Sequence, residues 1–172
     1  MNNTQITDPI EFTHYADNAW VNSTTKAIMK NGARNGRSNE QFHQDCSNGL
    51  MLQLAVFEYF KSNGFDVAME ENNKEFDLVV TSENVQHLID IKGIFKSNSK
   101  YFTQTSWESI AVPKYVSTFQ TPIHYLCFDC RDGVAFYSGY SSVTETSNPF
   151  KPSQFGSGSY MEPRKIKQGL PF

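Results

Sequence analysis

The sequence predicts an α/β domain in which a mixed β-sheet is flanked by helices on both faces. Three observations lead to this fold class. A helical pattern of apolar residues ends at Asn63-Gly64, short strand-like segments follow it, and a further helical segment starting near Pro113 separates those strands from two more. With 172 residues the chain is long enough for one domain with a real core. We expect a polar N-terminal arm over 1–37, a core over 38–140 and a loop-rich extension over 141–172.

The main helix is expected from Ser38 or Ser47 to Asn63. Its apolar stripe recurs at helical spacing and consists of Cys46, Leu50, Leu54, Phe57 and Phe60. Gly64 is a typical residue for ending it. A second helix is expected near Pro113, because proline is tolerated in a first turn.

The strands follow from short apolar segments bounded by turn residues. They are expected at 65–70, 75–81, 86–91, 123–129 and 134–137, with an edge strand around 159–162. The turn Cys130-Arg-Asp-Gly133 joins the fourth and fifth of these. The N-terminal arm is expected to hold a short helix and a mobile segment. No internal repeat or domain linker is evident.

The second and third strands form a predicted hairpin that carries three charged residues. Side chains alternate along a strand, so Asp90 and Lys92 share one face, away from Ile89 and Ile91. A four-residue turn over Ser82 to Val85 would give the pairs Thr81 with Gln86, Val79 with Leu88 and Asp77 with Asp90. A two-residue turn is expected to shift the pairing diagonally while leaving all three charges on one face.

These charges have the chemistry of a metal-dependent phosphodiesterase. Mg2+ prefers hard oxygen ligands and is commonly held by one or two carboxylates together with waters and a substrate phosphate. Asp77 and Asp90 would supply the carboxylates. Lys92 would stabilise the charge that develops as the nucleophile attacks.

Between residues 47 and 130 the chain resembles the PD-(D/E)xK nuclease superfamily of restriction-endonuclease-like and Holliday-junction-resolvase-like enzymes. The order of parts matches: a helix ending in Asn63-Gly64-Phe65, a strand through Val67, the acid Asp77, then Asp90-Ile91-Lys92. The resemblance implies a restriction-endonuclease-like core and a Mg2+- or Mn2+-dependent endonuclease acting on DNA. Asp77 and Asp90 would bind the metal, and Lys92 would be the catalytic lysine. Phe76 stands where the family has its eponymous proline.

Many superfamily members carry a further acid on the helix, facing the metal. Here Gln53 lies within the apolar stripe and is the expected counterpart, although a neutral amide brings no charge. An ordinary polar position at the edge of the core explains Gln53 equally well. Glu40 or Asp45 would complete the site instead if the helix begins later or bends at Gly49.

The net charge of −3 does not favour DNA binding, which depends on phosphate contacts by Lys and Arg, but the basic residues are clustered. Residues 24–37 contain no acidic residue, and the single acidic residue among 92–114 is Glu108. The predicted DNA contacts outside the catalytic residues are Lys30, Arg34, Arg37, Lys96, Lys100 and Lys114. Solvated surface is the competing interpretation, at about even weight for the first segment.

The remaining signals concern compartment and metal binding. No apolar segment is long enough for a membrane span and no signal peptide is evident, so a cytoplasmic protein without membrane contact is expected. Three cysteines argue against a disulfide framework. His124, Cys127 and Cys130 have a spacing reminiscent of zinc ligands, but on a strand, positions three apart point to opposite faces, which favours buried free thiols.

Three functions compete on this sequence. A divalent-metal-dependent deoxyribonuclease is favoured, of a restriction, junction-resolving or phage and mobile-element type. A nuclease-like module that binds nucleic acid or protein without cutting is the alternative, supported by Gln53 and the acidic composition. An unrelated domain with a surface cluster of ion pairs is the third. Double-strand cleavage needs two sites, which makes a homodimer a reasonable state for the favoured function.

Overall fold

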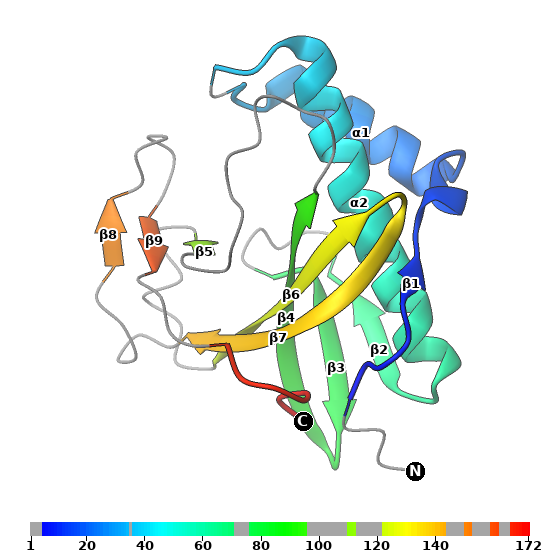
Figure 1. Cartoon of the computed structure of the whole chain (residues 1–172), viewed down its shortest axis with the longest axis vertical. Coiled ribbons are helices and arrows are strands. Elements are labelled where there is room, and N and C mark those ends of the chain that lie inside the picture. Colours follow the sequence, from blue (N-terminus) through cyan, green and yellow to red (C-terminus); the bar gives the residue numbers. More distant parts are fainter. Residues whose placement is uncertain are drawn as a thin grey trace.

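The computed structural model describes residues 5–34, 36–70, 76–95, 110–112, 122–143, 150–152, 159–161 and 166–172. A strongly twisted sheet and two helices make up most of this part of the chain (Figure 1). The helices are α1 (Ala19–Asn31) and α2 (Asn39–Ser62), preceded by a 3-10 turn at Thr13–Tyr15. The strands are β1 (Ile10–Glu11), β2 (Asp66–Met69), β3 (Leu78–Ser82), β4 (Val85–Phe95), β5 (Ile110–Val112), β6 (Ile123–Arg131), β7 (Val134–Val143), β8 (Phe150–Pro152) and β9 (Ser159–Met161).

The main sheet has six strands in the order β1-β7-β6-β4-β3-β2. β4 and β6 are parallel, and every other neighbouring pair is antiparallel. The predicted mixed α/β class is therefore confirmed. The described helices do not show the expected arrangement on both faces of the sheet, because α1 packs on α2. β5, β9 and β8 form a separate antiparallel sheet. Parallel pairing requires a long crossover, and residues 96–122 supply the connection between β4 and β6.

Helix α2 begins and ends where its capping residues dictate. The Ser38 hydroxyl accepts a hydrogen bond from the Gln41 amide at 3.1 Å, so the earlier of the two predicted starts is confirmed. At the other end Gly64 adopts φ of 82°, and the Phe65 amide bonds back to the Phe60 carbonyl at 3.0 Å. The helix runs through Gly49 without a break.

The β3–β4 hairpin has the predicted register. Thr81 pairs with Gln86 and Val79 with Leu88. The turn itself has only two residues, Glu83 and Asn84, with φ of 51° and 64°, and it closes on the pair Ser82 with Val85. The expectation that a two-residue turn would shift the pairing was wrong, because Ser82 and Val85 are the paired ends of this turn and not part of its loop.

Helix α2 covers one face of the sheet, which we call the helix face. A Cβ on Gly93 would lie 2.8 Å from Leu52 Cδ2, so α2 packs directly on β4 at this point. The core on this face includes Leu52, Val56, Phe60, Leu78, Ile89, Leu126 and Phe128. Alternation along β4 puts Asp90 and Lys92 on the opposite face, which we call the charged face. α1 packs on α2, and the second helix predicted near Pro113 falls in 113–120, outside the described residues.

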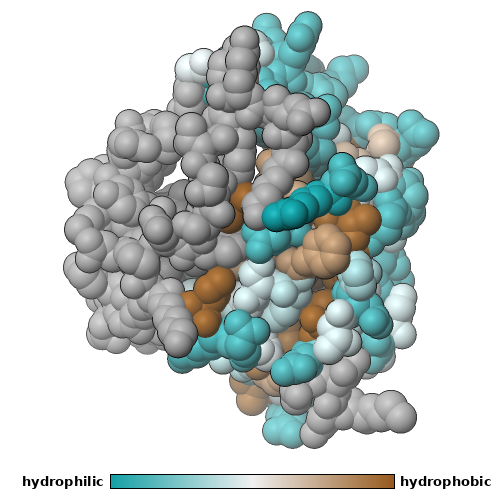
Figure 2. All heavy atoms as spheres, in the orientation of Figure 1, coloured by the Kyte–Doolittle hydropathy of each residue, from teal (hydrophilic) through white to brown (hydrophobic). Residues whose placement is uncertain are grey.

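Three further features bear on the predictions. β1 pairs with β7 at the edge of the sheet, although this part of the chain was expected to be an arm. On the face seen in Figure 2, hydrophilic side chains cover the helical part at the upper right, and several small apolar patches lie among polar side chains elsewhere on the described surface. No helix in the described part is long and apolar enough to cross a membrane.

Candidate metal and phosphate site

The candidate site is built from two neighbouring strands and the residue that precedes a third. Asp90 and Lys92 lie on β4, and Asp77 comes directly before β3. The parallel register pairs Asp90 with Tyr125 and Lys92 with Cys127 on β6. Paired residues of a parallel ladder point to the same face, so these four side chains line the charged face together.

Asp77 is fixed by two hydrogen bonds to β4. Its amide donates to the Ile89 carbonyl at 2.8 Å, and its carboxylate Oδ2 accepts from the Ile91 amide at 2.8 Å. The side chain thus continues the contact between the strands where the main-chain ladder of β3 ends at Leu78. One carboxylate oxygen is committed to this anchoring role, and the other remains for a ligand.

Asp90 and Lys92 form an ion pair along β4. Lys92 Nζ lies 3.2 Å from Asp90 Oδ1, and the two side chains expose 30% and 10% of their surface. The Lys92 ammonium is the partner of Asp90 Oδ1, which makes no other polar contact among the described residues. One ammonium only partly compensates two buried carboxyl groups, so a cation at this place would lower the cost of burying them.

The ionisation of the three groups is coupled. Burial, and then the charge of Asp90, raises the pKa of Asp77 to about 7. Burial also raises the pKa of Asp90, and Lys92 offsets this only in part. Burial alone would lower the pKa of Lys92, but Asp90 and Asp77 outweigh it and raise the pKa. Asp77 and Asp90 resist ionisation because only one ammonium compensates them. A bound cation would favour their ionised form, so the arrangement suits a cation site.

Tyr125 and Cys127 complete the charged face around these groups. The Tyr125 side chain is fully buried, its hydroxyl has no hydrogen-bond partner in the described part, and Lys92 Nζ lies 5.7 Å from the centre of its ring. Burial raises the pKa of Cys127 to about 12, so its thiol is protonated. Neither residue was predicted to lie at this site, because the parallel pairing of β4 with β6 leaves no signal in the local sequence.

The helix residues considered for the site are not brought to it. Gln53 is half-buried on α2, which covers the other face of the sheet, and it makes no hydrogen bond with the three charged residues. Asp45 is bonded to Arg37 and Gln41 at 2.7 and 2.6 Å. Glu40 is exposed in the first turn of α2. Glu40 or Asp45 was expected to complete the site only if the helix began later or bent at Gly49. Neither condition holds, because the helix begins at Asn39 and continues without a break.

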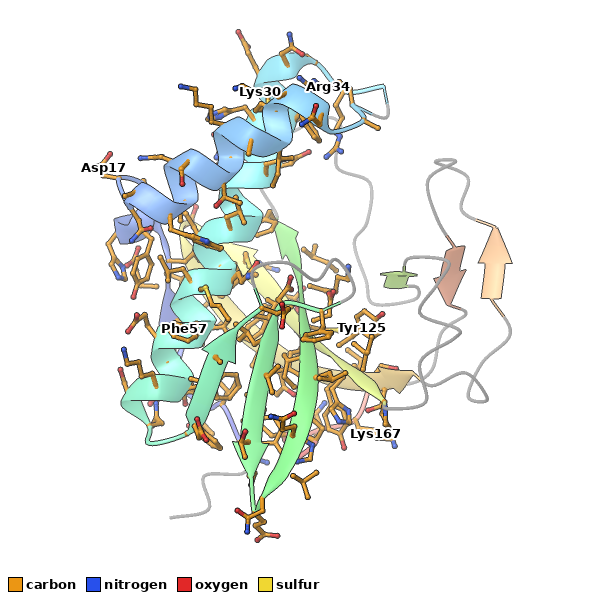
Figure 3. All side chains as sticks on the ribbon, turned by 180° about the vertical axis from the view of Figure 1, so that it is seen from behind. Asp17, Lys30, Arg34, Phe57, Tyr125 and Lys167 are labelled. Atoms are coloured by element: carbon orange, nitrogen blue, oxygen red, sulfur yellow. The ribbon has the colours of Figure 1, made fainter. Side chains whose placement is uncertain are left out.

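The predicted DNA-contacting residues fall into two groups. Lys96, Lys100 and Lys114 lie outside the described residues. Lys30 is exposed near the end of α1, and Figure 3 shows it with Arg34 at the turn between the helices, well away from Tyr125. The structure therefore does not bring this basic segment to the charged face.

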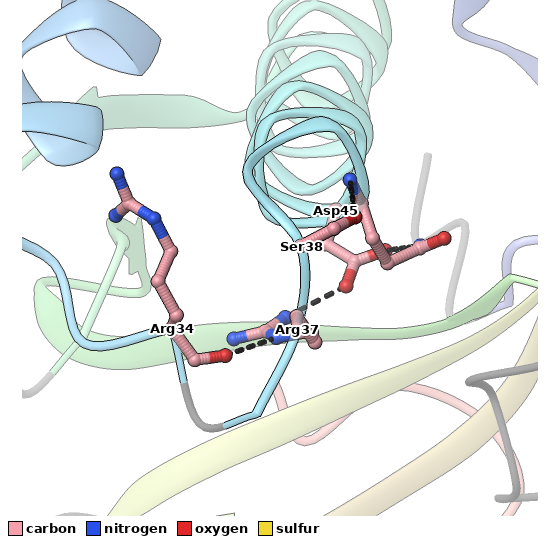
Figure 4. Close-up of polar contacts among 5 residues, drawn as sticks. Arg34, Arg37, Ser38 and Asp45 are labelled. Atoms are coloured by element: carbon pink, nitrogen blue, oxygen red, sulfur yellow. Dashed lines mark hydrogen bonds and ion pairs between the residues drawn. The ribbon is translucent and has the colours of Figure 1, made fainter.

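Arg34 and Arg37 already hold the turn between α1 and α2. Arg34 donates to the carbonyls of Met29 and Gly32 at 2.7 and 2.9 Å, at the C-terminus of α1. Arg37 donates to the Arg34 carbonyl at 3.0 Å and to Asp45 (Figure 4). Each guanidinium keeps N–H donors for a phosphate, but both groups also have a structural role.

His124, Cys127 and Cys130 do not converge. Cys127 pairs with Lys92 on the charged face, whereas Cys130 belongs to the core cluster on the helix face. His124 bonds the Ser142 hydroxyl at 2.6 Å. The three cysteines are free thiols, as predicted, and the described residues contain no group of three or more His, Cys, Asp or Glu side chains that could hold a metal.

No protein-family model matches the chain, and no curated protein is similar to it. The case for a ligand therefore rests on the site itself. Three buried side-chain polar atoms lack a hydrogen bond in the described part, and two of them, Asp90 Oδ1 and the Tyr125 hydroxyl, are at this site. Two carboxylates with free oxygens fit a hard divalent cation that retains several waters.

Proposed function

We propose that this protein is a divalent-metal-dependent deoxyribonuclease with a restriction-endonuclease-like core. One observation carries the proposal: Asp77, Asp90 and Lys92 meet on the sheet face that α2 does not cover, and two buried carboxyl groups there share one ammonium. A surface cluster of ion pairs would be solvated and would tolerate such groups without loss. A buried cluster with one acid in excess gains stability when it binds a cation.

Asp77 and Asp90 are the residues that would hold Mg2+ or Mn2+. When bound, the metal would polarise the phosphoryl oxygen and lower the pKa of a water. The Asp77 carboxylate is held in place by the Ile91 amide, and the Asp90 carboxylate by its ion pair with Lys92. Lys92 is held between Asp90 and the Tyr125 ring, from where its ammonium stabilises negative charge on the phosphate.

DNA contacts outside the site would come from Lys96, Lys100, Lys114, Lys30, Arg34 and Arg37. Of these, Lys30 is exposed, whereas Arg34 and Arg37 are half-buried. Lys30 would reach a duplex that extends past the site toward the α1–α2 turn. A homodimer would supply the second site that double-strand cleavage needs.

A nuclease assay tests the proposal. Wild-type protein is incubated with Mg2+ or Mn2+ and plasmid, single-stranded, branched or RNA substrates, with Asp90→Asn as the matched control. We expect metal-dependent cleavage of a DNA substrate by the wild type and none by the variant. Equal cleavage by both proteins would mean that a contaminant or another site is responsible and would refute the proposal.

A nuclease-like module that binds without cutting is the second candidate. The observation favouring it is that α2 lies on the other face, so the neutral Gln53 contributes no third oxygen ligand. Wild-type protein that binds DNA but cuts no substrate with either metal would favour this module over the enzyme. The Gln53→Glu variant separates the two roles of that position: a change in metal affinity places it at the site, and a change in stability alone places it at the edge of the core.

A further inference from the structure

The Tyr125 hydroxyl is a buried polar group that the protein leaves without a partner. Tyr125 is fully buried and stands beside Asp90 in the parallel ladder. Lys92 Nζ, which is ion-paired with Asp90, lies 5.7 Å from the centre of its ring, so Tyr125 belongs to the same cluster. An unbonded hydroxyl in such a place lowers stability, whereas a phenylalanine would fill the same space without that cost.

A second tyrosine shows what a structural hydroxyl looks like in this protein. Tyr137 on β7 is half-buried, and its hydroxyl donates to the Gly169 carbonyl at 2.7 Å, which ties the C-terminal segment to the sheet. Tyr125 makes no comparable bond. Its hydroxyl does not even donate to Asp90 or Asp77, although both carboxylates are near enough to influence its ionisation.

We propose that Tyr125 is a positioning residue of the cation site: its hydroxyl accepts a hydrogen bond from a water in the hydration shell of the divalent cation held by Asp77 and Asp90, while its ring orients Lys92. This inference rests on the proposed function. Mg2+ and Mn2+ sites with only two protein carboxylates keep several waters, and those waters donate hydrogen bonds to acceptors on the protein. The Tyr125 hydroxyl supplies a further acceptor next to the two carboxylates.

The test compares Tyr125→Phe with Tyr137→Phe. Mn2+ affinity is measured by titration calorimetry, and the melting temperature is measured without metal. For Tyr125→Phe we expect Mn2+ binding about 10- to 100-fold weaker than wild type and a higher metal-free melting temperature. For Tyr137→Phe we expect unchanged Mn2+ affinity and a lower melting temperature. A purely structural hydroxyl at Tyr125 would give the Tyr137 pattern.

The outcomes separate the two proposals. Wild type and Tyr125→Phe binding Mn2+ equally would overturn the role of Tyr125 and leave the nuclease proposal standing. Wild type that binds no Mn2+ would overturn both. Tyr125→Met, a second variant without a hydroxyl, should show the same loss of Mn2+ affinity as Tyr125→Phe, and it replaces that variant if Tyr125→Phe does not fold. Wild-type affinity in Tyr125→Met would overturn the inference.

Discussion

The two faces of β4 carry opposite chemistry within a few residues. On the helix face Ile89 is fully buried in the core, and Gly93 leaves just enough room for Leu52 of α2. On the charged face Asp90 and Lys92 form an ion pair, and the buried Tyr125 hydroxyl beside them has no hydrogen-bond partner in the described part. The helix face gains stability from apolar packing. The charged face buries polar groups at a cost in stability.

The largest stability change should come from the helix face. Ile89→Ala removes a fully buried side chain and should lower the free energy of unfolding by about 2–5 kcal/mol. The variant is not expected to change Mn2+ affinity, because the lost atoms face α2. Urea unfolding monitored by circular dichroism measures the first quantity and calorimetry the second. A large loss of Mn2+ affinity in the folded variant would show that the two faces are not separable.

The next largest effect should come from the charged face. Lys92→Ala removes the ammonium that stabilises charge on the phosphate and should lower kcat by about 10²-fold, while Mn2+ binding remains. Single-turnover cleavage and Mn2+ titration measure the two effects on the same preparation. Unchanged cleavage by Lys92→Ala would show that Lys92 takes no part in the reaction.

The stability of the metal-free protein should fall as pH rises from about 4 to about 7. The pKa of Asp77 is raised from 3.8 to about 7 in the folded protein, so the folded state holds a proton that the unfolded chain has already lost. One such group contributes a slope of at most about 1.4 kcal/mol per pH unit. Comparing the urea unfolding midpoints of wild type and Asp77→Asn between pH 4 and 8 isolates the contribution of Asp77. Equal slopes in both proteins would contradict the assignment.

The smallest effect is expected at the start of α2, far from the charged face. Ser38→Ala removes the cap on the Gln41 amide and should lower stability by about 1 kcal/mol. Ser38→Asp keeps an acceptor at the cap and serves as the matched control, with stability near wild type. A Ser38→Ala protein as stable as wild type would mean that the cap contributes nothing to α2.

Local signals predicted much of this fold. Gly64 marked the end of α2, and a turn over Ser82 to Val85 gave the hairpin register, because caps and turns depend only on near neighbours. The short β1 was missed because two residues give no periodicity. The convergence of Asp90 with Lys92 follows from spacing alone, whereas Tyr125 joins them only through a parallel pairing between segments far apart in sequence.

Gln53 shows the opposite failure. Its position in an apolar stripe predicts which face of the helix it occupies, but not which face of the sheet that helix covers. Gly93 shows which face of the sheet α2 covers, because only a residue without a side chain fits beneath Leu52. Whether a helix residue reaches a sheet site thus depends on the packing of the layers, which no local pattern contains.

Calorimetric titration of Mn2+ into wild-type protein and Asp90→Asn tests the central claim most directly. The claim is that Asp90, together with Asp77, holds a divalent cation on the charged face. We expect saturable binding to the wild type and none, or at least about 10²-fold weaker binding, to the variant, because a metal ligand contributes several kcal/mol. We also expect the variant to be less stable than wild type without metal, because Lys92 loses its ion-pair partner. Equal Mn2+ affinity in the two proteins would contradict the account.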